Sequence, residues 1–160
     1  MKQVIIETKF SEYENINELD NDLKLLSEKS IDVLDSAYAP YSEFNVGAAV
    51  LLENGEIITG TNQENAAYPS GLCAERVAIF YANSKYPNVA IKALAVAAKK
   101  DGELIANAVP PCGACRQVML ETENRFNTNM KLIMISKNSV LTVDNAKSLL
   151  PLSFDADYIK

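Results

Sequence analysis

Segments with helical spacing alternate with strand-like segments along this chain of 160 residues. Apolar residues recur near helical spacing in residues 17–37, and residues 72–83 and 113–123 are also predicted helices. The predicted strands are residues 44–52, 57–61, 89–98, 131–136 and 140–143. Helices interleaved with strands predict an α/β fold, in which helices pack on the faces of a sheet.

The connecting residues support the same order of elements. Pro40 ends the first helix, because a residue that precedes proline avoids the helical conformation. Asn54-Gly55 is a favoured hairpin turn between two of the strands, and Asp144 could N-cap a last short helix that ends at Leu150. Since no repeat or Pro/Gly-rich linker divides the chain, we expect one domain over residues 1–160, with residues 1–16 as a short strand or a loose extension.

Composition excludes several functional classes. The chain is 48% hydrophobic with a net charge of −6, so it lacks the excess of Lys and Arg that nucleic-acid binding requires. Its apolar runs are too short for a secretion signal or a membrane span. An odd number of cysteines disfavours a disulfide framework and favours a reducing compartment. We therefore expect a cytoplasmic protein without nucleic-acid or membrane partners.

The chain contains three cysteines and no histidine as candidate metal ligands. Cys73 is followed by Ala and Glu75, and Cys112 and Cys115 form a C-x-x-C pair after two prolines. Three thiolates can hold zinc with its fourth tetrahedral position open, as in catalytic sites. Glu75 then lies where it could handle protons beside a metal-bound water.

Both cysteine groups stand at the beginnings of predicted helices. The positive end of a helix dipole favours a thiolate over a thiol, which prepares a cysteine to be a ligand. Three thiolates give a zinc site a formal charge of −1, and Arg76 could offset this charge from beside the ligands.

Two other interpretations of the cysteines exist. Buried cysteines are often only small hydrophobic residues, and a C-x-x-C pair at a helix start is also the arrangement of thioredoxin-like redox sites. The redox interpretation gives Cys73 and Glu75 no role, and a closed structural zinc site would need a fourth Cys or His. An open metal site accounts for more of the residues.

The motifs around the cysteines resemble those of the zinc-dependent nucleoside deaminases, specifically the small-subunit cytidine deaminases. Five strings in the same order carry the resemblance, which extends over roughly residues 20–156. They are Phe44-Asn-Val-Gly-Ala-Ala-Val, Asn62-Gln-Glu64-Asn-Ala-Ala-Tyr68-Pro, Cys73-Ala-Glu75-Arg76, Pro111-Cys-Gly-Ala-Cys-Arg116-Gln117 and Leu149-Leu-Pro-Leu-Ser-Phe154.

The resemblance implies a three-layer α/β/α sandwich around a mixed five-stranded sheet, a homotetramer with shared active sites, and one zinc ion per subunit. It implies that the three cysteines bind zinc and that Glu75 is the catalytic acid and base. The implied substrate-binding residues are Phe44 at the pyrimidine, Asn62 and Glu64 at the ribose hydroxyls, Ala74, and Ala66, Tyr68 and Phe154 toward a neighbouring subunit's site. Arg76 and Gln117 would surround the metal ligands.

The implied reaction is hydrolytic deamination of cytidine and deoxycytidine to uridine and deoxyuridine, with release of ammonia, in pyrimidine salvage. No Lys or Arg occurs between Lys29 and Arg76, although this stretch holds most of the implied substrate residues. A nucleotide's phosphate would need cationic partners, so an uncharged nucleoside fits better. Deamination of a nucleoside antibiotic of the blasticidin type, or a zinc-bearing scaffold without activity, remain the alternatives.

Overall fold

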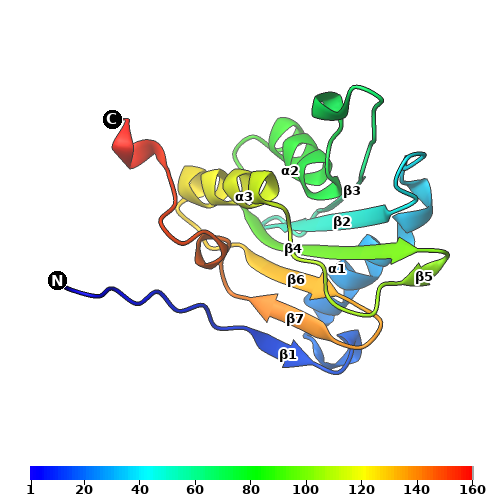
Figure 1. Ribbon diagram of the computed structural model, residues 1–160, viewed down its shortest axis with the longest axis horizontal. Helices are drawn as coiled ribbons and strands as arrows, with labels where there is room; N and C mark the ends of the chain where they lie inside the picture. The colour runs from blue at the N-terminus through cyan, green and yellow to red at the C-terminus, as the bar shows by residue number, and fades with distance from the viewer. Residues whose placement is uncertain (160) are drawn as a thin grey trace.

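One mixed sheet contains all seven strands of the computed structural model, which describes residues 1–159 (Figure 1). In chain order the strands are β1 (Ser11–Tyr13), β2 (Asn45–Leu52), β3 (Ile57–Thr61), β4 (Ile91–Lys100), β5 (Glu103–Leu104), β6 (Lys131–Ile135) and β7 (Val140–Val143). The α-helices are α1 (Asn21–Asp32), α2 (Ala74–Lys85) and α3 (Gly113–Phe126). Short 3-10 helices are η1 (Ile16–Glu18), η2 (Leu34–Ser36), η3 (Tyr68–Ser70), η4 (Lys147–Leu149) and η5 (Ala156–Tyr158).

The strand order is β1-β7-β6-β4-β2-β3, with β5 paired to one end of β4. β4 and β6 are parallel because α3 connects them as a crossover, and the other pairs are antiparallel. The predicted α/β class and mixed sheet are confirmed. The sheet has two strands more than expected, since the short strands β1 and β5 add to the five that the sequence predicts.

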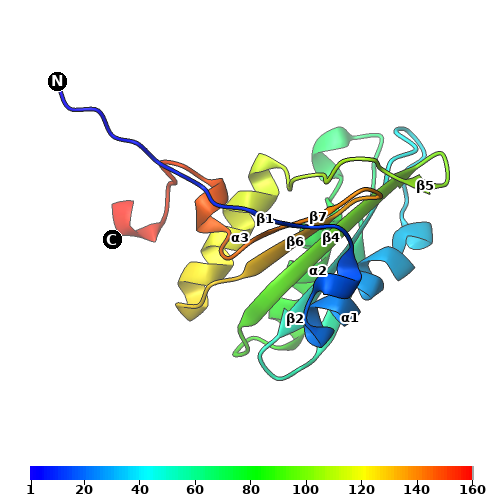
Figure 2. The same cartoon turned by 90° about the horizontal axis from the view of Figure 1, so that it is seen from below.

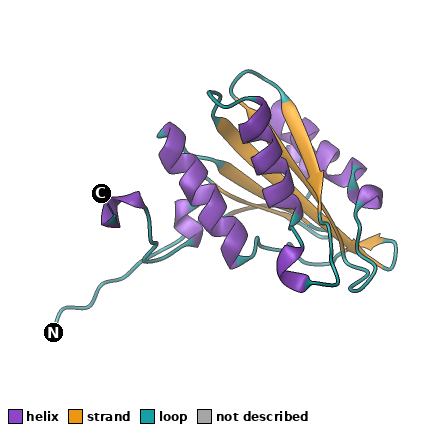
Figure 3. Ribbon diagram, turned by 90° about the horizontal axis from the view of Figure 1, so that it is seen from above, coloured by secondary structure: helices purple, strands orange, loops and turns teal. Residues whose placement is uncertain are grey.

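Helices cover both faces of the sheet, as Figure 3 shows. Side chains of β2 alternate between the faces: Ala48 and Val50 pack in one apolar cluster with residues of α2 and α3, and Ala49 packs in a second cluster with Leu26 of α1. Figure 2 shows α1 from its own side of the sheet. The result is the expected α/β/α sandwich, with α2 and α3 together on one face.

Gly60 of β3 allows α2 to lie directly on the sheet. A Cβ atom at this position would lie 2.6 Å from the backbone nitrogen of Ala78 and 2.8 Å from the carbonyl oxygen of Ala74. Since both atoms belong to the helix backbone, any side chain here would push α2 away. This close contact positions the first turn of α2, where Glu75 lies.

The N-terminal extension is mostly a loose arm. Residues 1–10 have no regular structure, and only Ser11–Tyr13 forms a strand, which pairs with β7 at the edge of the sheet. The hydroxyl of Thr8 donates a hydrogen bond to the carbonyl of Ser148 at 2.7 Å. Within residues 1–159, every helix is too short or too polar to cross a membrane.

The predicted cap at Asp144 is wrong. This side chain is exposed and forms an ion pair with Lys131 at 3.1 Å. The buried carboxylate of Glu123 on α3 instead accepts the backbone N–H groups of Ala146 and Lys147 where η4 begins, at 2.8 and 3.1 Å. Glu123, which is distant in sequence, is therefore the acceptor at this position instead of Asp144. The helix that begins there is a 3-10 helix.

Candidate active site

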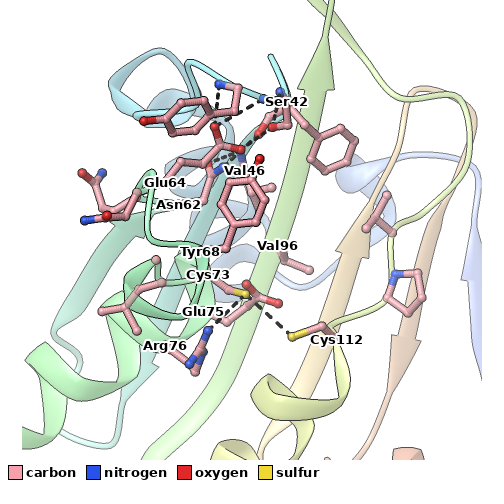
Figure 4. A pocket seen from close by; sticks show the side chains of 18 residues that line it. Ser42, Val46, Asn62, Glu64, Tyr68, Cys73, Glu75, Arg76, Val96 and Cys112 are labelled. Atoms are coloured by element: carbon pink, nitrogen blue, oxygen red, sulfur yellow. Dashed lines mark hydrogen bonds between the residues drawn. The ribbon is translucent and has the colours of Figure 1, made fainter.

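The beginnings of α2 and α3 lie close together and bring the three cysteines together. Figure 4 shows two of them, Cys73 and Cys112. Cys73 is the N-cap residue of α2, Cys112 is the N-cap residue of α3, and Cys115 lies in the first turn of α3. The N-terminal ends of both helices therefore point their partial positive charge at the sulfur atoms. Neither N-cap sulfur accepts a capping hydrogen bond from the backbone of its own helix.

The sulfur spacing fits a zinc ion. Sγ of Cys112 lies 3.7 Å from Sγ of Cys73 and 3.5 Å from Sγ of Cys115, and all three sulfurs lie within 4.8 Å of one another. Tetrahedral thiolates about 2.3 Å from zinc would be separated by roughly 3.8 Å. Three ligands leave the fourth position of the metal free for water or substrate.

The surroundings of Cys73 favour its thiolate form. A hydrogen bond from Cys115, together with the guanidinium of Arg76, lowers the pKa of Cys73 to about 5. Nη2 of Arg76 lies 3.6 Å from Sγ of Cys73. The pKa of Cys115 is raised because this thiol keeps its proton in the hydrogen bond to Cys73 and is buried. Arg76 therefore lies where the sequence predicts a compensating cation.

Glu75 lies beside the sulfurs with only 4% of its surface exposed. Burial, which disfavours the charged form, raises the pKa of this carboxyl group above its ordinary value. A carboxyl group with a raised pKa both accepts and releases a proton more readily near neutral pH. Its position on the first turn of α2, two residues after Cys73, aims it into the same space as the cysteines.

A cavity of about 680 Å³ opens in front of the cluster. Glu64, Glu75 and Arg76 are the charged residues of its wall. Eight of the predicted site residues line it: Phe44, Asn62, Glu64, Tyr68, Cys73, Glu75, Arg76 and Cys112. A volume of this size accommodates a small organic ligand.

The sugar-binding candidates Asn62 and Glu64 hold a neighbouring loop in place. Asn62 Oδ1 accepts the N–H of Val46 at 2.8 Å, and Asn62 Nδ2 donates to the carbonyl of Phe44 at 2.9 Å. The carboxylate of Glu64 accepts the N–H groups of Tyr41 and Ser42, and the hydroxyl of Ser42. These hydrogen bonds lower the pKa of Glu64, so this carboxylate is an acceptor at neutral pH.

Comparison with known proteins agrees with this geometry. A family described as "Cytidine and deoxycytidylate deaminase zinc-binding region" matches residues 20–128. The chain belongs to this family. The cytidine deaminase of Sporosarcina psychrophila is 40% identical over 136 residues, which cover 85% of this chain and 93% of that protein. That of Halalkalibacterium halodurans is 45% identical over 100 residues, or 62% and 71% of the two chains.

Solved structures of the family share the fold. Cytidine deaminase from Burkholderia pseudomallei superposes with a TM-score of 0.67 at 35% identity, covering 81% of this chain and 97% of that chain. The enzyme from Mycobacterium tuberculosis gives a TM-score of 0.65 at 32% identity, with coverage of 85% and 99%. The family resemblance predicted from the five motifs is therefore confirmed, and zinc is the metal that this deaminase family binds.

Some predicted residues lie away from the cavity wall. Ala74, the first residue of α2, is fully buried, Cys115 is also buried, and Ala66 is exposed on a loop. Phe154 is 60% exposed and stacks on Tyr158, with ring centroids 5.7 Å apart. Nε2 of Gln117 donates to the carbonyl of Phe154 at 2.9 Å, so within this subunit Gln117 binds the C-terminal segment.

Sequence reasoning missed two residues that support the site. Ser42 binds Glu64 across 22 positions of the chain. Arg116 donates from Nε to the carbonyl of Pro111 at 2.8 Å, directly before Cys112, and from Nη1 to the carbonyl of Leu149 at 3.0 Å. Both residues occur in or beside the recognised strings, but Glu64 and Leu149 are distant from them in sequence, and no local spacing could indicate these two partners.

Proposed function

We propose that this protein is a zinc-dependent hydrolase that deaminates cytidine and deoxycytidine to uridine and deoxyuridine in pyrimidine salvage in the cytoplasm. The observation that carries the proposal is the cluster of three cysteine sulfurs with buried Glu75 beside it, at the wall of a cavity. Membership of the deaminase family and the names of the relatives support the same reaction.

The residues divide the chemistry between them. Cys73, Cys112 and Cys115 would hold one zinc ion per subunit, which supplies Lewis acidity that lowers the pKa of a water molecule. Glu75 takes a proton from that water and delivers it to N3 of the pyrimidine, so that C4 becomes electrophilic. After the hydroxyl group adds to C4, Glu75 takes the remaining proton from that hydroxyl and transfers it to the amino group. The C4–N bond breaks, ammonia leaves, and a carbonyl group remains at C4.

The cavity wall supports a nucleoside as the substrate. Phe44 would pack against the pyrimidine, while Asn62 and Glu64 would bind the sugar. Arg76 is the basic residue of the wall and already contacts Cys73. A phosphate near Glu64 would meet a negative carboxylate without a cationic partner, which favours cytidine over its monophosphate.

A homotetramer would complete the site. Tyr68 is 77% exposed at the rim of the cavity, and Phe154 is exposed on the C-terminal segment. Large apolar side chains on the surface are available to another subunit. In the proposed assembly Ala66, Tyr68 and Phe154 contribute to a neighbouring subunit's site.

A spectrophotometric assay with cytidine and deoxycytidine, paired with a zinc determination, tests the function. We expect turnover of both nucleosides, and loss of both bound zinc and activity in Cys112→Ala. If both substrates stay unchanged while zinc is bound, the proposal fails and an inactive scaffold is favoured. Preferred deamination of blasticidin S over cytidine would instead identify an antibiotic deaminase.

A further inference from the structure

A loop at residues 38–44 forms one rim of the cavity and is tied to Glu64. The backbone N–H groups of Tyr41 and Ser42 donate to Oε2 of Glu64 at 2.9 and 3.3 Å, and the Ser42 hydroxyl donates to Oε1. Glu43 has a φ of 55°, which is in the left-handed region that residues with a side chain seldom adopt. The loop therefore depends on these contacts for its conformation.

The Ser42 hydroxyl connects two residues proposed to bind the substrate. It donates its proton to Glu64, and its oxygen accepts the N–H of Phe44 at 3.1 Å. A hydroxyl group has one donor and two acceptor positions, so both connections form at once. Ser42 lines the cavity together with Glu64 and Phe44.

The remaining hydrogen-bonding capacity of this group matches a single hydroxyl. Each carboxylate oxygen has about two acceptor positions. Oε2 of Glu64 receives two N–H groups and Oε1 receives one hydroxyl, which leaves one position on Oε1. Nδ2 of Asn62 has donated one of its two hydrogens, to Phe44. The free N–H of Asn62 and the free acceptor position of Glu64 suit one hydroxyl group, which would accept a hydrogen bond from Asn62 and donate one to Glu64.

We propose that Ser42 is a positioning residue for sugar recognition, whose hydroxyl orients Oε1 of Glu64 to accept a hydrogen bond from a sugar hydroxyl of the nucleoside. This inference rests on the proposed function, since it assumes that the cavity binds a nucleoside. Ser42 acts through Glu64 and does not itself touch the reacting atoms. Water can replace Ser42 at either contact, because its side chain is exposed, but water cannot fix the direction of Oε1.

The test compares cytidine with 2′,3′-dideoxycytidine, which keeps the reacting base and lacks the sugar hydroxyls that Glu64 would bind. For Ser42→Ala we expect about a tenfold lower kcat/KM with cytidine, mostly because KM rises. This is the effect expected when one hydrogen bond to a charged group is lost. With dideoxycytidine we expect a change below about threefold. Ser42→Thr, which keeps the hydroxyl, should restore cytidine kinetics.

Ser84→Ala is the matched control, since Ser84 is an exposed serine on α2 outside the cavity wall. The thermal midpoint of Ser42→Ala should stay within roughly 2 °C of the unmutated protein. Equal losses of kcat/KM for the two substrates in Ser42→Ala, or an unchanged KM for cytidine, would overturn the role of Ser42. Normal turnover by the unmutated enzyme would still uphold the proposed function in that case. If the zinc-loaded, unmutated protein deaminates neither nucleoside, both proposals are overturned.

Discussion

Two carboxylates of the same cavity have opposite electrostatic environments. Glu75 is buried and its pKa is raised, whereas hydrogen bonds from Ser42 and the backbone lower the pKa of Glu64. The surroundings thus give two chemically equivalent groups opposite pKa shifts. This difference supports proton transfer by Glu75 and sugar binding by Glu64.

The first prediction concerns Glu75. Glu75→Gln should retain bound zinc, because the three sulfurs are unchanged, and should lower kcat by about 10²- to 10⁴-fold, because the amide cannot carry the proton. Turnover of cytidine and metal content measured on one preparation check both parts. Glu56→Gln, at an exposed hairpin turn, is the control. A near-native rate in Glu75→Gln would contradict the assignment.

At the scale of elements, the site depends on how close α2 and α3 lie to the sheet. Gly60 lets the backbone of α2 contact β3, and Glu123 of α3 binds the segments that flank the last two strands. Neither residue lines the cavity. Both hold the elements that carry the cysteines and Glu75.

Gly60→Ala should therefore lower the free energy of unfolding by about 1–3 kcal/mol, since the new Cβ would meet the α2 backbone. Urea denaturation measures the change. Gly113→Ala is a suitable control, because a Cβ there has no neighbour within 4 Å and the residue lies in the first turn of α3. If the two variants have the same free energy of unfolding, α2 can move away from β3 without loss of stability, and the prediction is wrong.

Glu123→Ala should cost about 3 kcal/mol of unfolding free energy. The carboxylate accepts the N–H groups of Met130, Ala146 and Lys147 at 2.7, 2.8 and 3.1 Å, and its removal leaves three backbone donors unpaired. Chemical denaturation beside Glu121→Ala, an exposed position on the same helix, isolates the effect. A difference below about 0.5 kcal/mol would mean that water replaces the carboxylate.

At the scale of the whole molecule, the C-terminal segment extends away from the body of the subunit (Figure 1). It carries the exposed aromatic pair Phe154 and Tyr158 and is held to α3 through Gln117. In the proposed tetramer this segment reaches a neighbouring site. A mass near 70 kDa in solution, four times the chain's 17.5 kDa, is the expected result for the assembly.

Mixing two inactive variants tests whether sites are shared. Phe154→Ala and Glu75→Gln should each have low activity, yet subunit exchange would create sites with both an intact Glu75 and an intact Phe154. We expect activity in the mixture to exceed the sum of the separate activities, measured as cytidine turnover after incubation. If the mixture shows no gain although native mass spectrometry detects mixed oligomers, Phe154 does not serve a neighbouring site.

The sequence alone determined the α/β class, the positions of most elements and the candidate metal ligands. Periodicity and local turn residues report these features directly, as at Ile57–Thr61 and Val140–Val143, where predicted and observed bounds agree. Cys73, Glu75, Cys112 and Cys115 were found because their motifs are short and local.

Only the tertiary structure decided which distant groups meet. The acceptor at the start of η4 is Glu123 rather than nearby Asp144, and the donors to Glu64 come from Tyr41 and Ser42, more than 20 positions away. Hydrogen bonds between remote segments depend on sheet order and on helix position, and no local pattern encodes their geometry. For that reason the sequence could identify the carboxylates of this site but not the partners that give each its role.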